Sequence, residues 1–287
     1  MHGKYSAGTE MIDATKEMRE VFARDGAIKA TGLLSLAELE ECRRCYEFNL
    51  ENPGPTALNL FEGTNDATYN DLGTAKSLEV YGPILEKIGF ADFLADLWGS
   101  EHVWYLGEEL FRKDGSDVGR TPWHQDTPYF ATRGPHMANI WISFETLPAN
   151  NALEVIKGSH VGITYDGAAF MDPEDPTRPL WGAEHYPPLP DIEAERAKDP
   201  TSWDVLSWDL ALGDAIVLHS GALHGGAPVD KECPTRNTLV LRFFGDDVRY
   251  RPYPNATPDY FMDLRAFDIE SLRVGELFRG GHFFQLR

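Results

Sequence analysis

Two side chains of types that bind metals lie two residues apart near the middle of the chain, His124 and Asp126. In an extended segment, side chains alternate between two sides with a period of two, so this imidazole and this carboxylate point the same way. Together they can occupy two adjacent positions around a metal ion. Alone the pair is a weak signal, because the chain has 9 histidines and 46 acidic residues and can form such a pair by chance.

A second histidine from later in the chain would complete a set of three ligands. His219 and His224 are the candidates, and they are five residues apart. In one continuous strand an odd separation places them on opposite faces, so both can join only if Gly221 bends the chain. We favour His224, because Gly225 and Gly226 follow it and would let a bulky co-substrate approach the backbone. For His219, at the end of an apolar strand, the alternative is a hydrogen-bonded structural role.

Two histidines and one carboxylate form the facial triad of non-haem iron(II) oxygenases. Three protein ligands leave up to three positions, enough for a bidentate co-substrate and dioxygen. The sequence therefore predicts that His124, Asp126 and His224 bind Fe(II), with O2 and a bidentate co-substrate such as 2-oxoglutarate.

The distal carboxylate of 2-oxoglutarate is best bound by a guanidinium group, which can donate two parallel hydrogen bonds. Arg236 lies twelve residues after His224, at the start of a predicted strand. A turn at residues 228–231 is expected to bring this strand back beside the histidine. Arg242 shares the face of Arg236 and is the alternative, although it could instead form a surface ion pair with Asp246 or Asp247.

Short apolar segments separated by turns predict an antiparallel sandwich or jelly roll with the early helices packed outside it. We expect strands at residues 27–30, 102–111, 138–144, 209–212, 215–219 and 237–244, and helices at 10–25, 35–49 and 84–99. Residues 51–78 have the composition of a loop. Residues 163–204 are rich in Pro, Asp and Glu and predict a long insertion that acts as a lid, with Trp181, Tyr186 and Trp203 near the substrate.

The 287 residues are 42% hydrophobic and 12% aromatic, which is enough for one substantial core, so we expect a single domain over residues 1–287. The formal net charge is −20. A field of that sign repels phosphate backbones and anionic lipids, so nucleic acid and membrane surfaces are not expected partners. It favours neutral or cationic small molecules over polyanionic substrates such as acyl-coenzyme A. The sequence does not indicate an oligomeric state.

Cys42 and Cys45 form a C-x-x-C spacing within a predicted helix. No second such pair accompanies it, so we interpret both as helix-face thiols in a reducing compartment rather than a zinc or redox site. The N-terminus lacks an apolar signal core, and no run of 18 apolar residues occurs. A cytoplasmic location is expected.

Four motifs in order resemble those of the phytanoyl-CoA dioxygenase family of Fe(II)/2-oxoglutarate oxygenases, over roughly residues 21–247. They are a helix–strand–helix start, a first metal motif, an internal turn motif and a closing block, at residues 22–38, 123–130, 153–160 and 213–247. Two positions depart from the family pattern. Lys157 stands where the family usually has proline, and Gly226 stands where some members carry a hydroxyl residue that contacts the co-substrate.

The resemblance implies a mainly β protein with flanking helices, built on a double-stranded β-helix (a cupin-like jelly roll). It implies iron bound by the triad named above and 2-oxoglutarate bound by Arg236. It further implies that Gln125 and Trp141 line the co-substrate pocket, and that His160 is a structural hydrogen-bonding residue.

The expected activity is hydroxylation of a small molecule, with conversion of 2-oxoglutarate to succinate and CO2. A carboxylate at position 126 favours hydroxylation over halogenation, because related halogenases place a small residue there. Desaturation and ring closure are alternative outcomes of the same chemistry. Two other classes are a catalytically silent binding protein on the same scaffold and a hydrolase that uses bound zinc. No motif identifies the substrate.

Overall fold

Two antiparallel sheets face each other and enclose the interior in which the predicted site lies. In the computed structural model, the described residues are 13–60, 68–115, 117–168, 175, 177–180, 182, 186–226, 228–252, 272–280 and 283–287. The larger sheet has eight strands in the order β1-β10-β7-β12-β4-β3-β2, with β14 also paired to β4, and the smaller sheet has four in the order β5-β11-β8-β9. This arrangement confirms the predicted jelly-roll class.

In the larger sheet, the bounds of β1, β4, β7, β10 and β12 follow the predicted segments closely, whereas β2, β3 and β14 were not predicted. Its strands are β1 (Ala27–Ala30), β2 (Leu58–Leu60), β3 (Thr68–Asp71), β4 (Val103–Asp114), β7 (Met137–Ser143), β10 (Ala215–Leu218), β12 (Thr235–Gly245) and β14 (Phe284–Gln285). The smaller sheet contains β5 (Thr121–His124), β8 (Leu153–Ile156), β9 (Val205–Leu206) and β11 (His224–Gly226). A separate pair joins β6 (Thr132–Arg133) to β13 (Arg249–Tyr250).

Alternation along the central strands separates the two faces of the larger sheet. On β7 and β12, Ile140 and Leu241 pack in the cluster that contains the helices, whereas Trp141 and Val240 pack against Val155 of the smaller sheet. Period-two alternation therefore sends Asn139 and Arg242 inward as well. The inward face of these strands supplies polar groups to an otherwise apolar interior.

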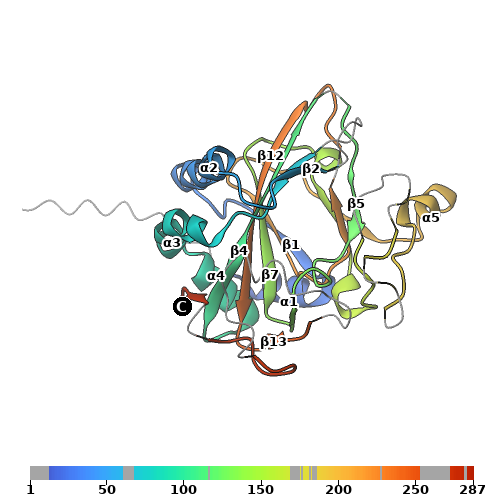
Figure 1. The fold of residues 1–287 in the computed structure, drawn as a ribbon. Coiled ribbons are helices and arrows are strands. Elements are labelled where there is room, and N and C mark those ends of the chain that lie inside the picture. Colours follow the sequence, from blue (N-terminus) through green and yellow to red (C-terminus); the bar gives the residue numbers. More distant parts are fainter. Residues whose placement is uncertain are drawn as a thin grey trace, which may run out of the picture.

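Helices cover the outer face of the larger sheet. Figure 1 shows α2, α3 and α4 on one side of this sheet, with β5 and α5 on the other. The helices are α1 (Lys16–Asp25), α2 (Leu36–Glu51), α3 (Leu78–Lys87), α4 (Phe90–Trp98) and α5 (Ile192–Lys198). The predicted capping box is present, because Ser35 accepts from the Glu38 N–H while the Glu38 side chain accepts from the Ser35 N–H.

Three local predictions were wrong. The third helix is two helices, because Ile88 is extended (φ −81°, ψ 124°) and Gly89 follows it before α4 begins. Residues 51–78, predicted as loop, contain β2 and β3, which extend the sheet at the edge of β4. Residues 209–212 form only an isolated bridge, Leu147 to Leu210. Strand pairing at a sheet edge depends on the partner strand, so a short segment's own composition predicts it poorly.

The described part of the C-terminal tail packs onto the core. Phe278 and Phe283 are buried with Trp104 and Phe244, and β14 pairs with β4. Residues 253–271 of the tail, and Trp181 in the insertion, lie outside the described residues.

The C-x-x-C cysteines are buried and free on the inner face of α2. Burial raises the pKa of the Cys45 thiol to about 12 and raises that of Cys42 further, which keeps both thiols protonated. The structure thus agrees with their interpretation as thiols on a helix face, and it shows in addition that this face is buried. Within the described ranges, no helix has both the length and the apolar character required to cross a bilayer.

Candidate metal centre

The predicted ligands meet at the end of the smaller sheet. His124 is the last residue of β5 and His224 the first of β11, and the two lie directly opposite each other in the strand register. Their ring centroids are 4.2 Å apart. Asp126 lies in the turn that follows β5, where its backbone N–H donates to the carbonyl of Ser220 at 2.9 Å.

The three ligand atoms converge on one point. Asp126 Oδ1 lies 3.5 Å from His124 Nε2 and 3.6 Å from His224 Nε2, and a set of three donor atoms lies within 4.8 Å of one another. Donor atoms that each lie about 2 Å from one ion, in adjacent positions, are separated by about 3 Å. The spacing therefore suits a single metal ion after a small contraction.

Both imidazoles are held in the tautomer that a metal requires. The Nδ1 atoms of His124 and His224 lie 2.9 Å from the carbonyl oxygens of Pro122 and Ala222, each two residues earlier in the chain. A carbonyl only accepts, so Nδ1 carries the hydrogen and the Nε2 lone pair faces Asp126. Burial, together with the neighbouring His124, lowers the pKa of His224 to about 4, so this ring stays neutral and able to bind a metal at neutral pH.

The second oxygen of Asp126 is anchored to the larger sheet. Oδ2 accepts from Asn139 Nδ2 at 2.6 Å and from Arg242 Nη2 at 3.1 Å, which leaves Oδ1 facing the histidines. Asn139 in turn accepts from the hydroxyl of Ser220 at 3.1 Å. Burial would raise the pKa of Asp126, but the charge of the neighbouring Arg242 guanidinium acts against it, and the pKa lies well below its usual range.

Arg242 is buried and pairs with two carboxylates, those of Glu109 and Asp126. The expectation of a surface ion pair with Asp246 or Asp247 was wrong, because the face of β12 that carries Arg242 points into the interior. Asp246 instead pairs with His102 and Arg279. Arg242 is thus engaged in orienting a predicted metal ligand.

Replacement of Arg242 by Met is expected to weaken metal binding by about 10- to 100-fold, the usual cost of removing a group that orients a ligand. Anaerobic calorimetry with Fe(II), and with Co(II) as a spectroscopic probe, measures the change. In the single variant, the buried Glu109 carboxylate loses its guanidinium partner. The Glu109→Gln/Arg242→Met double variant removes that unpaired charge as well. Arg112→Met, an exposed change on β4, is the matched control. Unchanged affinity in both Arg242 variants would contradict this role.

Arg236 lies further inside, near the start of β12. Its side chain is buried, with Cζ 5.9 Å from the ring centroid of Trp141 and Nη1 3.4 Å from the Asn151 carbonyl. A Cβ on Gly226 would lie 3.1 Å from Arg236 Nη2 and 2.7 Å from Thr121 Oγ1. Arg236 and the Thr121 hydroxyl therefore lie beside the backbone of Gly226, two residues beyond His224, and Trp141 lies next to Arg236.

The route by which Arg236 reaches this position differs from the prediction. β12 does not return beside β11 in one sheet; it lies in the larger sheet, between β4 and β7, while β11 lies between β5 and β8. Arg236 reaches Gly226 across the interior of the jelly roll. Burial lowers its pKa to about 10, so the guanidinium remains charged at neutral pH.

Gln125 has its amide fully used by the backbone of neighbouring loops. It donates to the carbonyls of Gly221 at 2.7 Å and Ile163 at 3.1 Å, and it accepts from the Tyr165 N–H at 2.9 Å. We therefore propose that Gln125 fixes the start of the insertion against the metal loop, in place of the co-substrate contact expected from the family resemblance.

Sequence reasoning assigned no role to Asn139, Thr121 or Tyr129, although Tyr129 lies in the first metal motif. The Tyr129 hydroxyl exchanges hydrogen bonds with the backbone of Ala168, at 2.8 and 2.9 Å, and its ring packs edge-on to His124. The sequence could have identified Asn139, because a polar residue at an inward position of an apolar strand indicates a buried polar contact. Thr121 had no such signal, because its partner Gly226 is more than 100 residues away.

His219 does not join the metal group. Its Nε2 lies 2.9 Å from the Gly134 carbonyl, and its Nδ1 accepts from the Gly221 N–H at 2.9 Å. Full burial lowers the pKa of His219 to about 4. This is the hydrogen-bonded structural role that the sequence left as the alternative.

The stability of the metal-free protein is expected to fall as the pH drops from about 6.5 to about 4. In this window the unfolded chain binds a proton at His219 and at His224, whereas the folded chain does not, so the free energy of unfolding rises with pH. The slope is at most about 1.4 kcal/mol per pH unit for each histidine. Urea unfolding at several pH values measures it, and His219→Gln should reduce the slope by about one proton. A flat profile in the parent chain would refute the expectation.

A jelly roll that brings two histidines and one aspartate to a single point defines a cupin-like metalloprotein. The chain belongs to the phytanoyl-CoA dioxygenase (PhyH) family, whose model matches residues 22–236. None of the curated protein sequences compared with this chain matches it significantly.

Solved structures share this fold over nearly the whole chain. The epimerase SnoN from nogalamycin biosynthesis, in complex with Fe3+, α-ketoglutarate and nogalamycin RO, is 17% identical with a TM-score of 0.68, covering 95% of this chain and 98% of SnoN. The carbocyclase SnoK from the same biosynthesis is 15% identical with a TM-score of 0.67, covering 97% and 100%. EctD from S. alaskensis with bound Fe is 18% identical with a TM-score of 0.62, covering 97% and 92%.

Proposed function

We propose that this chain is an Fe(II)/2-oxoglutarate-dependent oxygenase that hydroxylates a small molecule. The observation that carries the proposal is the convergence of His124 Nε2, Asp126 Oδ1 and His224 Nε2 on one point. Membership of the phytanoyl-CoA dioxygenase family supports it. SnoN and EctD, which share the fold, are described with iron and with α-ketoglutarate or 2-oxoglutarate.

The donor set fits iron(II). Two neutral imidazoles and one carboxylate on a single side match the facial triad of non-haem iron oxygenases, whereas structural zinc sites close four protein ligands around the ion. Bound iron and 2-oxoglutarate would supply the oxidising chemistry, in which O2 is consumed and succinate and CO2 are released as the substrate is oxidised.

The roles of the chain's own residues follow from their contacts. His124, Asp126 and His224 hold the ion. Asn139 and Arg242 donate to Oδ2 of Asp126, the oxygen that does not face the histidines, and so keep it turned away from the ion. Asp126 occupies the ligand position that halogenases leave open, which favours hydroxylation.

Arg236 supplies the positive charge for the distal carboxylate of 2-oxoglutarate, with the Trp141 ring and the Thr121 hydroxyl beside it. The Thr121 hydroxyl compensates for the lack of a side chain at Gly226. Burial strengthens this charge pairing, because water does not compete for the guanidinium.

Epimerisation, ring closure and desaturation are alternative outcomes of the same chemistry. The structural relatives support the first two as alternatives to hydroxylation. SnoN is described as an epimerase and SnoK as a carbocyclase. The substrate is proposed only as a small molecule, since SnoN is described with the small molecule nogalamycin RO and EctD with 5-hydroxyectoine.

Substrate screening by 2-oxoglutarate turnover tests the proposal. Purified protein with Fe(II) is incubated with a metabolite library, and O2 consumption and succinate release are measured together. Substrate-dependent, equimolar O2 use and succinate release supports the oxygenase. Absence of Fe(II) binding by calorimetry would indicate a silent scaffold, and turnover of a substrate without O2 would indicate the zinc hydrolase.

A further inference from the structure

One turn of the chain lies against the segments that carry the predicted metal ligands. It comprises residues 219–222 and closes where the Ala222 N–H donates to the His219 carbonyl at 2.8 Å, as in a β-turn. It follows β10 of the larger sheet and precedes β11 of the smaller one. The chain crosses from one sheet to the other here, so the position of this turn bears on both.

Three consecutive carbonyls of the turn accept hydrogen bonds from residues that form or flank the metal site. The donor–acceptor pairs are Asp126 N to Ser220 O at 2.9 Å, Gln125 Nε2 to Gly221 O at 2.7 Å, and His224 Nδ1 to Ala222 O at 2.9 Å. The Ser220 hydroxyl also donates to Asn139 at 3.1 Å, and Asn139 holds the second oxygen of Asp126. A shift of the turn would therefore displace Asp126 and rotate the His224 ring.

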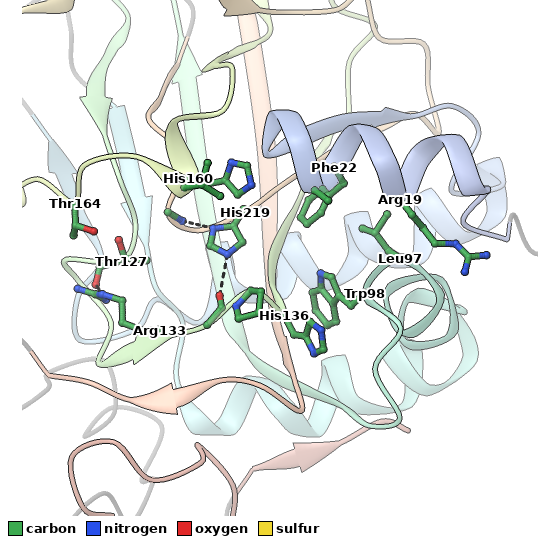
Figure 2. Close-up of a pocket in the computed structure, with 15 residues that line it drawn as sticks. Arg19, Phe22, Leu97, Trp98, Thr127, Arg133, His136, His160, Thr164 and His219 are labelled. Carbon is green, nitrogen blue, oxygen red and sulfur yellow. Dashed lines mark hydrogen bonds between the residues drawn. The ribbon is translucent and has the colours of Figure 1, made fainter.

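The side chain of His219 ties this turn to the loop that follows Asp126. Its Nδ1 accepts from the Gly221 N–H at 2.9 Å, and its Nε2 lies 2.9 Å from the Gly134 carbonyl; Figure 2 draws both contacts as dashed lines. Because Nδ1 accepts, Nε2 carries the hydrogen and donates to Gly134. This tautomer is the opposite of that in the two predicted ligand histidines.

The His219 ring fits closely against the turn and borders a cavity. A Cβ on Gly221 would lie 3.1 Å from Nδ1 and 3.3 Å from Cε1 of this ring, so a larger residue there would push the ring and the turn apart. The cavity has a volume of about 430 Å³, and His219, Gly221 and Gly134 all line it (Figure 2). Without the ring, water in this space would reach the Gly221 N–H and the Gly134 carbonyl, so we expect such variants to fold.

We propose that His219 is a positioning residue for the metal centre, which acts by holding the 219–222 turn against the 127–134 loop. This inference rests on the metal binding in the proposed function. With both hydrogen bonds of the ring in place, the carbonyls of the turn stay where Asp126 and His224 require them. A packing role would depend on the volume and apolar character of the side chain. The positioning role depends on its two hydrogen-bonding atoms.

A series of substitutions at His219 separates positioning from packing. Leucine fills the site without polar atoms, glutamine keeps a donor for the Gly134 carbonyl, and asparagine keeps an acceptor for the Gly221 N–H. Anaerobic calorimetry with Fe(II) or Co(II) is expected to show about tenfold weaker binding for His219→Leu, at the low end of the usual cost of removing a group that orients a ligand. His219→Gln and His219→Asn should lie between this variant and the parent. His136→Leu, in the wall of the same cavity but outside the turn, is the matched control and should bind as the parent does.

Hydrogen exchange of the metal-free proteins gives a second readout, at Asp126 itself. The backbone N–H of Asp126 donates to Ser220 in the turn, so in His219→Leu it should exchange about tenfold faster than in the parent, since two hydrogen bonds that hold the turn are lost. Nuclear magnetic resonance of the 15N-labelled chain resolves this amide. Amides of β12 should exchange at the parent rate, because the core of the larger sheet is unaffected.

Metal affinity in His219→Leu equal to or above that in His219→Gln would overturn the proposal, because packing alone predicts that order. An Asp126 amide that exchanges at the parent rate in His219→Leu would also overturn it, as would faster exchange throughout β12, which would show a general loss of stability. If the parent chain binds neither Fe(II) nor Co(II), the proposed function fails, whereas the exchange of the Asp126 amide still decides whether His219 positions this residue.

Discussion

The Asp126→Ala protein is expected to lose substrate-dependent succinate formation completely. Without this carboxylate, only two imidazoles remain to hold the ion, and the charge that balances Fe(II) is gone. We expect the variant to stay folded, because Arg242 keeps Glu109 as a partner after Asp126 is removed. Succinate release and Fe(II) affinity are measured on the same preparation, with circular dichroism to confirm the fold.

His124→Ala is expected to give the same result, and Asp117→Ala is the matched control. Asp117 is exposed and lies outside the ligand set, so its removal should leave activity and iron affinity unchanged. Activity at the parent rate in Asp126→Ala or His124→Ala would show that the ion is held elsewhere. Loss of activity with full iron affinity would instead place these residues at the substrate.

The second large effect is expected for Arg236→Ala, which should raise the 2-oxoglutarate concentration required for half-maximal rate by about 30- to 4,000-fold. This range follows from about 2–5 kcal/mol for truncating one partner of a buried charge pair, at a factor of ten for each 1.4 kcal/mol. The effect should appear in the dependence on 2-oxoglutarate, with iron affinity unchanged.

Arg236→Lys separates charge from geometry. A lysine keeps the positive charge but cannot donate two parallel hydrogen bonds, so an intermediate requirement is expected. If Arg236→Ala leaves the 2-oxoglutarate requirement unchanged, the role passes to Arg242, and the ion pairs of Arg242 with Glu109 and Asp126 must then rearrange on binding.

Sequence periodicity was sufficient for the parts of the site that depend on local geometry. His124 and Asp126 were predicted to face one point from their spacing of two. His219 was also predicted to stay apart, but for another reason than its odd spacing from His224, since it follows β10 of the larger sheet and His224 begins β11 of the smaller one. The double-stranded β-helix was predicted from the family resemblance. No single segment determines how the strands pair, but the four motifs in order identified a family whose fold is known. The capping box at Ser35 could also be predicted, because it depends only on residues three positions apart in the sequence.

What could not be predicted depends on contacts between distant segments. Arg242 was predicted only as the alternative to Arg236 or as a surface residue, since its buried pairing with Glu109 and Asp126 is visible only once β12 is placed between β4 and β7. The hydrogen bonds of Gln125 go to loops 40 and 96 residues away in sequence, and its expected place in the co-substrate pocket remains a prediction. The assignments of Arg236 and Trp141 to 2-oxoglutarate remain predictions.

The position of Asp126 has a consequence for motion. One of its oxygens faces the histidines of the smaller sheet, and the other is bound by Asn139 and Arg242 of the larger sheet. A metal ion bound there would join the two halves of the jelly roll through a single carboxylate. Backbone amides in β5 and β11 should then exchange with deuterated solvent more slowly when iron is bound, because separating the sheets would require breaking coordination bonds.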